Sequence, residues 1–236
     1  MDYAEIDIPV PVSTISILSF DFSSCENVQK EELIEKLEVI LKFDPDVIVL
    51  QGLSAMNCDC IFRFLKSNKY KYTRFDAAGK NKYFEVFATK NIVLEGGYTQ
   101  FIKTSQNKGI GKCLVGFGNQ NPKKVWIFTG CFDSSSVVNR KIQVAELASE
   151  AKKHEGFPII FAGNTNIPVW QDLKEPKDWS DAWKTKGASN NEKTSLQDRY
   201  DRMWFTGNVN VEKFEIVDFN GPEDERKGIF SIFKSV

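Results

Sequence analysis

Apolar residues in the first half of the chain occur in compact runs and in stripes with helical spacing. Residues 14–20 (TISILSF) form a β-branched run and residues 47–51 (VIVLQ) a continuously apolar one, which predicts two strands, the second buried on both faces. Between them, residues 28–42 carry apolar positions on one face and charges on the other, which is typical of an amphipathic helix. Residues 60–67 (CIFRFLKS) are predicted to form a second helix that leads into a strand at 70–75. The apolar stripe of the first helix consists of Leu33, Ile34, Leu37, Ile40 and Leu41.

The second half begins with short β-rich segments separated by turn residues, which predicts a meander. A further amphipathic helix, with apolar positions from Val138 to Ala151, is expected to end near Gly156. A strand at 157–164 follows, and residues 168–198 are predicted to be a loop-rich insertion that contains three tryptophans and short helices. This order favours two mixed sheets face to face with helices outside, an α/β sandwich. The meander strands are 83–89, 92–102, 112–118 and 124–130, and the closing strands are 200–207, 211–219 and 228–233.

The composition limits the class of protein. With 236 residues, of which 42% are hydrophobic, the chain can bury a full core, so we predict one domain over residues 1–236 with an N-terminal arm at 1–13. The net charge of −1 excludes whole-molecule attraction to nucleic acid or anionic membranes. The apolar runs are far shorter than the roughly 20 residues of a membrane-spanning helix. Five cysteines form no regular framework and no secretory signal pattern is visible, so we expect a nuclear or cytoplasmic protein with reduced thiols.

Several segments, in one order along the chain, resemble the endonuclease/exonuclease/phosphatase superfamily, and within it the tyrosyl-DNA phosphodiesterase 2 enzymes. The segment DPDVIVLQG is similar to the family's Pro-Asp-Val-Ile-x-Leu-Gln-Glu, and IIFAGNTNI to Ile-Phe-Ala-Gly-Asp-Thr-Asn-Leu. RYDRMWF is similar to Arg-Phe-Asp-Arg-Ile-Phe-Phe, while ISILSFD, IFTGCFDSSSVVNRKIQVAEL and DERKGIF stand where the family has further landmarks. The resemblance covers about residues 15–233. It implies the deoxyribonuclease I-like fold, a four-layer α/β/β/α sandwich.

The chain departs from the family pattern where active relatives carry their reactive side chains. In those relatives the carboxylate after Leu-Gln binds Mg²⁺, and that position here is Gly52. The aspartate of Gly-Asp-x-Asn, which orients or activates the attacking water, corresponds to Asn164, whose amide cannot accept a proton. The resemblance further places Cys131 at a histidine, Glu225 and Arg226 at the terminal Asp-His pair, and Asp21 at the asparagine of the first strand.

Other family positions are kept or remain acidic, and they leave a weak divalent-ion site as an alternative. The only histidine of the chain, His154, follows a predicted helix and is interpreted as a solvated C-terminal cap. A mechanism that requires two histidines therefore cannot be assembled. The matching residues are Thr165, Asn166 and Asp201, and the acidic ones are Asp21, Asp133 and Glu225.

The resemblance and the replacements together predict a protein without catalytic residues, bound metal or other cofactor. We expect a pseudoenzyme of the tyrosyl-DNA phosphodiesterase 2 type that acts as a protein-binding or scaffolding module in a nucleic-acid-processing complex. A protein is the expected partner, and no membrane partner is expected. Two alternatives stay open: an atypical Mg²⁺-dependent phosphodiesterase that uses the acidic residues named above, and a non-catalytic nucleic-acid-binding domain in which Arg226 and nearby lysines bind phosphates.

Three weaker patterns have structural interpretations. The spacing of Cys58 and Cys60 is shorter than that of typical zinc ligands, and a second ligand pair is missing. The glycines between residues 109 and 118 are not followed by the Gly-Lys-Ser/Thr of a phosphate loop, so turns or bulges are expected there. The three tryptophans of residues 168–198 are expected to pack onto the sandwich rather than to stack on bases.

Overall fold

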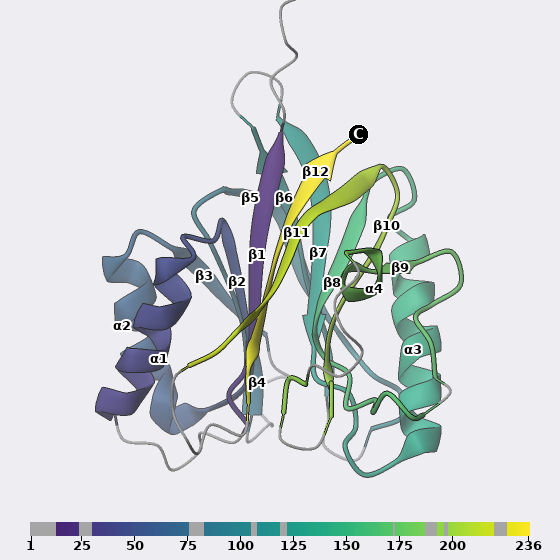
Figure 1. Cartoon of the computed structure of the whole chain (residues 1–236), viewed down its shortest axis with the longest axis horizontal. Helices are drawn as coiled ribbons and strands as arrows, with labels where there is room; N and C mark the ends of the chain where they lie inside the picture. Colours follow the sequence, from purple (N-terminus) through teal and green to yellow (C-terminus); the bar gives the residue numbers. More distant parts are fainter. Residues whose placement is uncertain are drawn as a thin grey trace, which may run out of the picture.

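The computed structural model describes residues 13–23, 30–75, 83–104, 108–118, 122–171, 173–186, 193–195, 198–219 and 226–236. Within these ranges two six-stranded sheets lie face to face. Helices α1 (Lys30–Lys42) and α2 (Ala55–Ser67) cover the outer face of one sheet, and α3 (Val137–Lys152) covers the outer face of the other (Figure 1). The predicted four-layer α/β/β/α sandwich is therefore confirmed, whereas residues 1–12 of the predicted arm lie outside the described residues.

The sheet beneath α1 and α2, called the first sheet below, has the strand order β11-β12-β1-β2-β4-β3. Strand β1 pairs in parallel with β2 and antiparallel with β12, so the ends of β1 and β2 and the start of β12 meet at one edge. The strands are β1 (Thr14–Asp21), β2 (Val47–Ser54), β3 (Lys71–Phe75), β4 (Tyr83–Thr89), β11 (Val209–Val217) and β12 (Gly228–Ser235).

The second sheet lies beneath α3 and has the order β5-β6-β7-β8-β10-β9. Strand β8 is parallel to β7 and antiparallel to β10, which places Asn164 at the end of β8 opposite Asp201 at the start of β10. The short helix α4 (Ala182–Thr185) follows β9. The strands are β5 (Ile92–Gln100), β6 (Gly109–Phe117), β7 (Lys123–Gly130), β8 (Ile159–Asn164), β9 (Ser180–Asp181) and β10 (Asp201–Thr206).

Three apolar layers hold the sandwich together, and β2 contributes to two of them. Its alternate residues Val47 and Val49 pack between the sheets, whereas Ile48 and Leu50 pack beneath α1 and α2. Every residue of β2 is buried, which confirms the predicted strand with two covered faces. The third layer lies between the second sheet and α3, where Leu147 packs with aromatic residues. Those aromatic residues include Trp126, Phe128, Phe161 and Trp204.

Several element boundaries differ from the sequence-based expectation, and two of these differences change the interpretation of a segment. Helix α2 begins at Ala55 rather than at residue 60, because β2 continues to Ser54 and the chain enters the helix directly. Strand β6 begins at Gly109, so the first glycines of the 109–118 run lie in a strand and not in a turn. The reason is close packing, since a Cβ on Gly111 would overlap the ring of Phe75 from the first sheet.

The interpretation of His154 as a solvated cap is wrong. Its side chain is 14% exposed, and its ring lies over Trp126 with a centroid distance of 4.1 Å. Its Nε2 lies 3.1 Å from Nζ of Lys112, which also pairs with Glu150. Burial and the positive charge of Lys112 lower the pKa of His154. The residue therefore belongs to the packing between α3 and the second sheet rather than to solvent.

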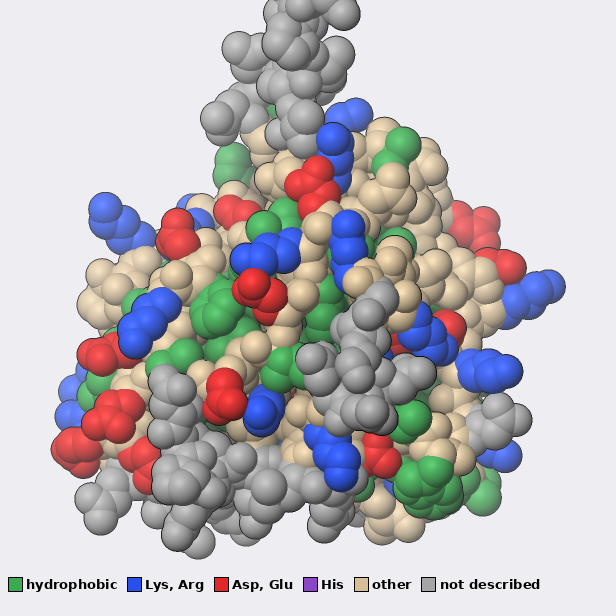
Figure 2. All heavy atoms as spheres, viewed as in Figure 1, with side chains coloured by type: hydrophobic (Ala, Val, Ile, Leu, Met, Phe, Trp, Pro, Cys, Tyr) green, Lys and Arg blue, Asp and Glu red, His purple; other side chains and the backbone are tan. Residues whose placement is uncertain are grey.

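The tryptophans of the insertion only partly follow the expectation of packing. Trp183 is buried and Trp179 packs against the layer beneath α3, but Trp170 is 79% exposed. The face of the molecule in Figure 2 carries basic and acidic side chains interspersed over its surface. None of the helices within the described ranges has both the length and the apolar character that a membrane span requires.

Candidate functional site

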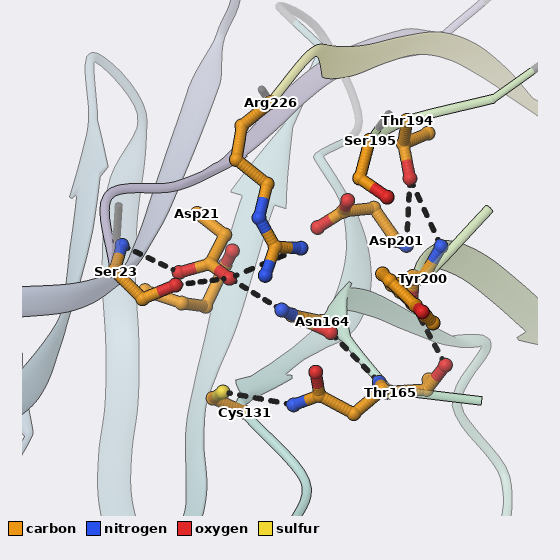
Figure 3. Close-up of polar contacts among 12 residues, drawn as sticks. Asp21, Ser23, Cys131, Asn164, Thr165, Thr194, Ser195, Tyr200, Asp201 and Arg226 are labelled. Carbon is orange, nitrogen blue, oxygen red and sulfur yellow. Dashed lines mark hydrogen bonds and ion pairs between the residues drawn. The ribbon is translucent and has the colours of Figure 1, made fainter. Parts of the chain in front are cut away.

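The candidate site lies at one edge of the sandwich, where strands of both sheets end or begin (Figure 3). Asp21 ends β1 of the first sheet, and Asn164 ends β8 of the second. Asp201 starts β10, and Arg226 lies two residues before β12. Because these strand ends share one edge, the structure brings together most of the residues singled out in the sequence. We call Asp21, Asn164, Asp201 and Arg226 the rim cluster.

Gly52 occupies a bulge in β2 at this edge. The pairing of β2 with β4 shifts between Leu50 and Leu53, so Gln51 and Gly52 together face one residue of β4. The φ angle of Gly52 is 67°, a left-handed conformation that favours glycine. A Cβ at this position would lie 2.7 Å from Asp21 Oδ1 and 2.7 Å from the backbone nitrogen of Ser23. The space in which a side chain of residue 52 would begin is therefore filled by the turn that follows β1.

The carboxylate of Asp21 is 1% exposed at the residue level and is fully engaged within the protein. Its Oδ1 accepts a hydrogen bond from the backbone nitrogen of Ser23 at 2.9 Å, and its Oδ2 accepts one from the Ser23 hydroxyl at 2.9 Å. Oδ2 also accepts a hydrogen bond from the amide Nδ2 of Asn164, across the two sheets. Asp21 thus acts as a buried acceptor that ties the first sheet to the second.

Asn164 uses both ends of its amide. While Nδ2 donates to Asp21, Oδ1 accepts a hydrogen bond of 2.7 Å from the backbone nitrogen of Asn166. An aspartate at position 164 would place a second carboxylate against Asp21, and like charges at hydrogen-bond distance repel. In the family pattern the first strand ends in asparagine and the β8 position is aspartate. Carboxylate and amide have therefore exchanged places between the two sheets.

Arg226 supplies positive charge to the rim cluster. Its side chain is 17% exposed, and Nη1 lies 3.6 Å from Oδ2 of Asp21. Figure 3 shows the guanidinium group reaching between Asp21 and Asp201, and Cζ lies 5.6 Å from the centre of the Tyr200 ring. Burial alone would lower the pKa of Arg226, but Asp21 and Asp201 raise it. The guanidinium is thus a permanently charged neighbour of both carboxylates.

Asp201 is the least satisfied group of the cluster. The residue is 1% exposed, and within the described residues neither of its carboxylate oxygens has a hydrogen-bond partner. Burial and the nearby charge of Asp21 raise its pKa to about 7, although Arg226 acts in the opposite direction. Its backbone nitrogen donates to Oγ1 of Thr194 at 3.1 Å. A carboxyl group that titrates near neutral pH is one that can hold or release a proton under ordinary conditions.

Cys131 and Asn166 lie beside the cluster, on the side of the second sheet. Cys131 is 5% exposed, and burial raises the pKa of its thiol to about 11 despite the neighbouring Lys108. Nζ of Lys108 lies 3.2 Å from the Cys131 sulfur and donates to the carbonyl oxygen of Phe132 at 3.0 Å. Asn166 donates from Nδ2 to the same carbonyl at 2.8 Å. Cys131 is thus a buried neutral thiol and not an activated nucleophile.

Sequence reasoning missed two charged residues near the site, Lys108 and Glu85. Burial would lower the pKa of Lys108, but Cys131, Asp21 and Glu85 raise it, so the ammonium stays charged. Glu85 is 5% exposed and is the residue of β4 that faces the Gln51–Gly52 bulge. A glutamate in the middle of the apolar segment YFEVFAT was a signal for a buried charge. Lys108 lies just before β6 and no pattern marks it.

One predicted site residue, Asp133, has its carboxylate engaged outside the rim cluster. Asp133 serves the start of α3, because its Oδ1 accepts hydrogen bonds from Ser135 and Ser136 and its Oδ2 accepts one from Asn139. These bonds engage the Asp133 carboxylate in the turn that leads into α3, whose N-cap residue is Ser136, and a contribution of Asp133 to an ion site stays a prediction. Glu225 lies outside the described residues.

The donor set of the rim does not fit Mg²⁺. This ion needs carboxylate and other oxygens free to approach it at about 2.1 Å in octahedral geometry. Both oxygens of Asp21 already accept hydrogen bonds, and the guanidinium of Arg226 stands beside them. Throughout the part of the chain that the structure describes, no three His, Cys, Asp or Glu side chains gather in a way that could hold a metal ion.

Replacing Gly52 by alanine should destabilise the fold. We expect the free energy of unfolding to fall by about 1–2 kcal/mol from left-handed strain, with a further loss from the contacts at Asp21 and Ser23. Denaturant unfolding would measure the loss. Gly156→Ala is the matched control, because Gly156 has φ 99° but nothing within 4 Å of the added Cβ. Equal losses in the two variants would show that the space at Gly52 is not filled as described.

No protein-family model matches the sequence, and no curated protein matches it either. The fold itself, two facing sheets with helices outside both, is that of the endonuclease/exonuclease/phosphatase superfamily, the deoxyribonuclease I-like fold.

Among solved structures with this fold, truncated TDP2 of Caenorhabditis elegans is 16% identical with a TM-score of 0.77, over 93% of this chain and 97% of that one. The catalytic domain of human Nocturnin with a bound sulfate anion is 16% identical with a TM-score of 0.79, over 94% of this chain and 95% of that one. An endonuclease/exonuclease/phosphatase family protein of Bacteroides thetaiotaomicron is 10% identical with a TM-score of 0.76, over 95% and 99% of the two chains. Identities this low establish the shared fold.

Proposed function

We propose that the protein is a catalytically inactive pseudoenzyme of the TDP2 type, which acts as a protein-binding or scaffolding module, in the setting of a nucleic-acid-processing complex. The observation that carries the proposal is the position of the Arg226 guanidinium beside the carboxylates of the rim cluster. Arg226 lies against Asp21, at an edge where the resemblance implies a metal ion in active relatives. The protein's own guanidinium thus balances carboxylates that would otherwise attract an external cation.

The other groups at the rim also support loss of catalysis. Gly52 has no side chain that could bind a metal ion, and the Asn164 amide cannot take a proton from water. Cys131 holds its proton at neutral pH, since its pKa is raised to about 11. Loss of one catalytic group commonly costs roughly 10²- to 10⁴-fold in rate. Several roles are missing at once, so we infer that phosphodiester cleavage is negligible, even though such losses do not add.

One feature favours the alternative of an atypical phosphodiesterase. Asp201, with a pKa of about 7, is poised to act as a proton acceptor. Asp201 is buried, however, and the positive charge of Arg226 compensates its negative form. The proximity of Arg226 to Asp21 and Asp201 also weakens the alternative of a nucleic-acid-binding domain, because these carboxylates compete with a phosphate for its guanidinium. With a net charge of −1, a protein partner is favoured.

A phosphodiesterase assay tests the proposal. The protein, with Mg²⁺ or Mn²⁺, is incubated with 5′-phosphotyrosyl DNA and with single-stranded oligonucleotides, beside the variant Asp201→Asn. We expect no turnover above the protein-free control in either sample. Metal-dependent turnover by the wild type that Asp201→Asn removes would overturn the pseudoenzyme proposal. Oligonucleotide binding that weakens steeply with salt would instead favour the nucleic-acid-binding alternative.

A further inference from the structure

A groove runs between α1 and α2 on the outer face of the first sheet, away from the rim cluster. Its volume is about 660 Å³. Helix α2 contributes one stripe of residues along its whole length, and α1 contributes its first turns. The groove is therefore an elongated surface and not a closed cavity. Its lining residues are Lys30, Leu33, Ile34, Met56, Asn57, Asp59, Cys60, Arg63, Phe64 and Ser67.

The floor of this groove is apolar. Leu33 is buried at its base, whereas Ile34, Cys60 and Phe64 are half-buried. Met56 is 78% exposed at one end. An unbranched, polarisable methionine beside aromatic and aliphatic side chains is common on surfaces that accept helices of partner proteins.

The charged side chains that border the groove form no ion pairs with described residues. Lys30 and Arg63 form no ion pair or hydrogen bond with any described residue, and neither does Asp59. Elsewhere on the same helix pair, Lys36 does pair with Glu32 at 3.7 Å. Two unpaired cations and one unpaired anion beside an apolar floor give the groove an excess of positive charge. A partner with carboxylates flanking an apolar face would complement it.

We propose that the α1–α2 groove binds an amphipathic helix of a protein partner, with apolar residues at i, i+3 or i+4 and i+7 and with carboxylates opposite Lys30 and Arg63. The lining stripe of α2 runs from Met56 to Ser67. At 1.5 Å per residue this stripe accepts a partner helix of about three turns. The inference rests on the proposed function, because it gives the protein-binding module its binding surface.

Designed peptides test the groove without knowledge of the natural partner. A fluorescent amphipathic peptide of about three to four helical turns carries leucines on one face and flanking glutamates, and a second peptide has every glutamate replaced by lysine. Fluorescence anisotropy measures both. We expect the glutamate peptide to bind at least about tenfold more tightly than the lysine peptide. Equal affinity of the two peptides, or no binding of the glutamate peptide, would overturn the inference.

Variants locate the binding to the groove. Met56→Glu should lower the affinity for the glutamate peptide by about tenfold or more, since it replaces an apolar side chain at one end of the groove by a negative charge. Arg63→Glu should reverse the preference, so that the lysine peptide becomes the tighter ligand. Ile102→Glu is the matched control, because Ile102 is 83% exposed and its backbone bonds to Glu146 of α3 on the opposite side of the sandwich. A loss of affinity in Ile102→Glu equal to that in Met56→Glu would contradict the assignment.

A second copy of the chain is the competing occupant. Sedimentation of the wild type alone decides this point: concentration-dependent dimerisation that Met56→Glu abolishes would overturn the proposal of a partner helix. Failure of the groove is also distinguishable from failure of the pseudoenzyme proposal. Phosphodiesterase turnover would contradict only the pseudoenzyme proposal. Absence of peptide binding in a protein without turnover would contradict only the proposal for the groove.

Discussion

Replacing Arg226 by methionine is expected to lower the free energy of unfolding by about 3 kcal/mol at pH 8. The guanidinium of Arg226 faces two carboxylates that are each 1% exposed, Asp21 and Asp201. Methionine keeps much of the length of the side chain but removes the charge, which leaves buried negative charges without compensation. Denaturant unfolding at pH 8 and pH 5 measures the effect. We expect a smaller loss at pH 5, because Asp201, whose folded pKa is about 7, is then protonated.

Lys227→Met is the matched control for Arg226→Met. Lys227 is the next residue in the chain and pairs with Asp218 at 3.0 Å, but the two side chains are 40% and 58% exposed. Exposed pairs contribute between about 0 and 1 kcal/mol, so this variant should unfold almost like the wild type. A loss in Arg226→Met no larger than in Lys227→Met would contradict the role of Arg226 as the internal counterion of the rim cluster.

Asp201→Asn should change the pH dependence of stability. In the wild type Asp201 has a pKa of about 7 in the folded state and a value near 3.8 in the unfolded state. Between these values the folded state holds a proton that the unfolded state has lost, so this residue makes stability fall as the pH rises. At about 1.4 kcal/mol per pKa unit, its contribution amounts to at most about 4 kcal/mol. Asparagine cannot ionise, so the variant should gain stability over the wild type from pH 5 to pH 8.

The informative quantity is the difference between the two stability profiles, because other carboxylates contribute in the opposite direction. Chemical unfolding of wild type and Asp201→Asn at half-unit steps from pH 4 to pH 8 gives this difference. Asp44→Asn serves as the control, since the Asp44 side chain is 86% exposed and its ion pair with Lys90 lies in solvent. Parallel profiles of wild type and Asp201→Asn would show that Asp201 ionises normally in the folded protein.

The periodicity of apolar residues predicted those helices and strands whose apolar faces are buried in one of the apolar layers. Of the predicted α1 stripe, Leu33, Leu37 and Ile40 are buried against the first sheet, whereas Ile34 and Leu41 are half-buried. The continuous run of β2 follows from burial between the helices and the second sheet. The order of these elements, together with the ordered motifs, was enough to predict the four-layer sandwich. Such patterns arise from the fixed number of residues per turn of a helix or per repeat of a strand, so they can be recognised in a single sequence.

The parts that could not be predicted depend on contacts between distant segments. Nothing in the sequence around His154 indicates that its ring would meet Trp126, which comes from another strand. The sequence could not show whether Asp133 bonds to the turn that leads into α3 or to the rim. Asp133 lies between Cys131, which stands beside the rim, and the start of α3. The charge of Lys108 matters only because Cys131 and Asp21 stand beside it. In each of these cases tertiary packing decided the outcome.

Polar bonds at the rim cross from one sheet to the other, and this gives the residues that form them a structural reason to persist that is independent of chemistry. Gln51 of β2 donates to Thr129 of β7 at 2.9 Å, and Asn164 of β8 donates to Asp21 of β1. Selection for a folded chain alone would hold these side chains in place over evolutionary time. Their presence in a related chain would therefore say little about whether that chain cleaves phosphodiesters.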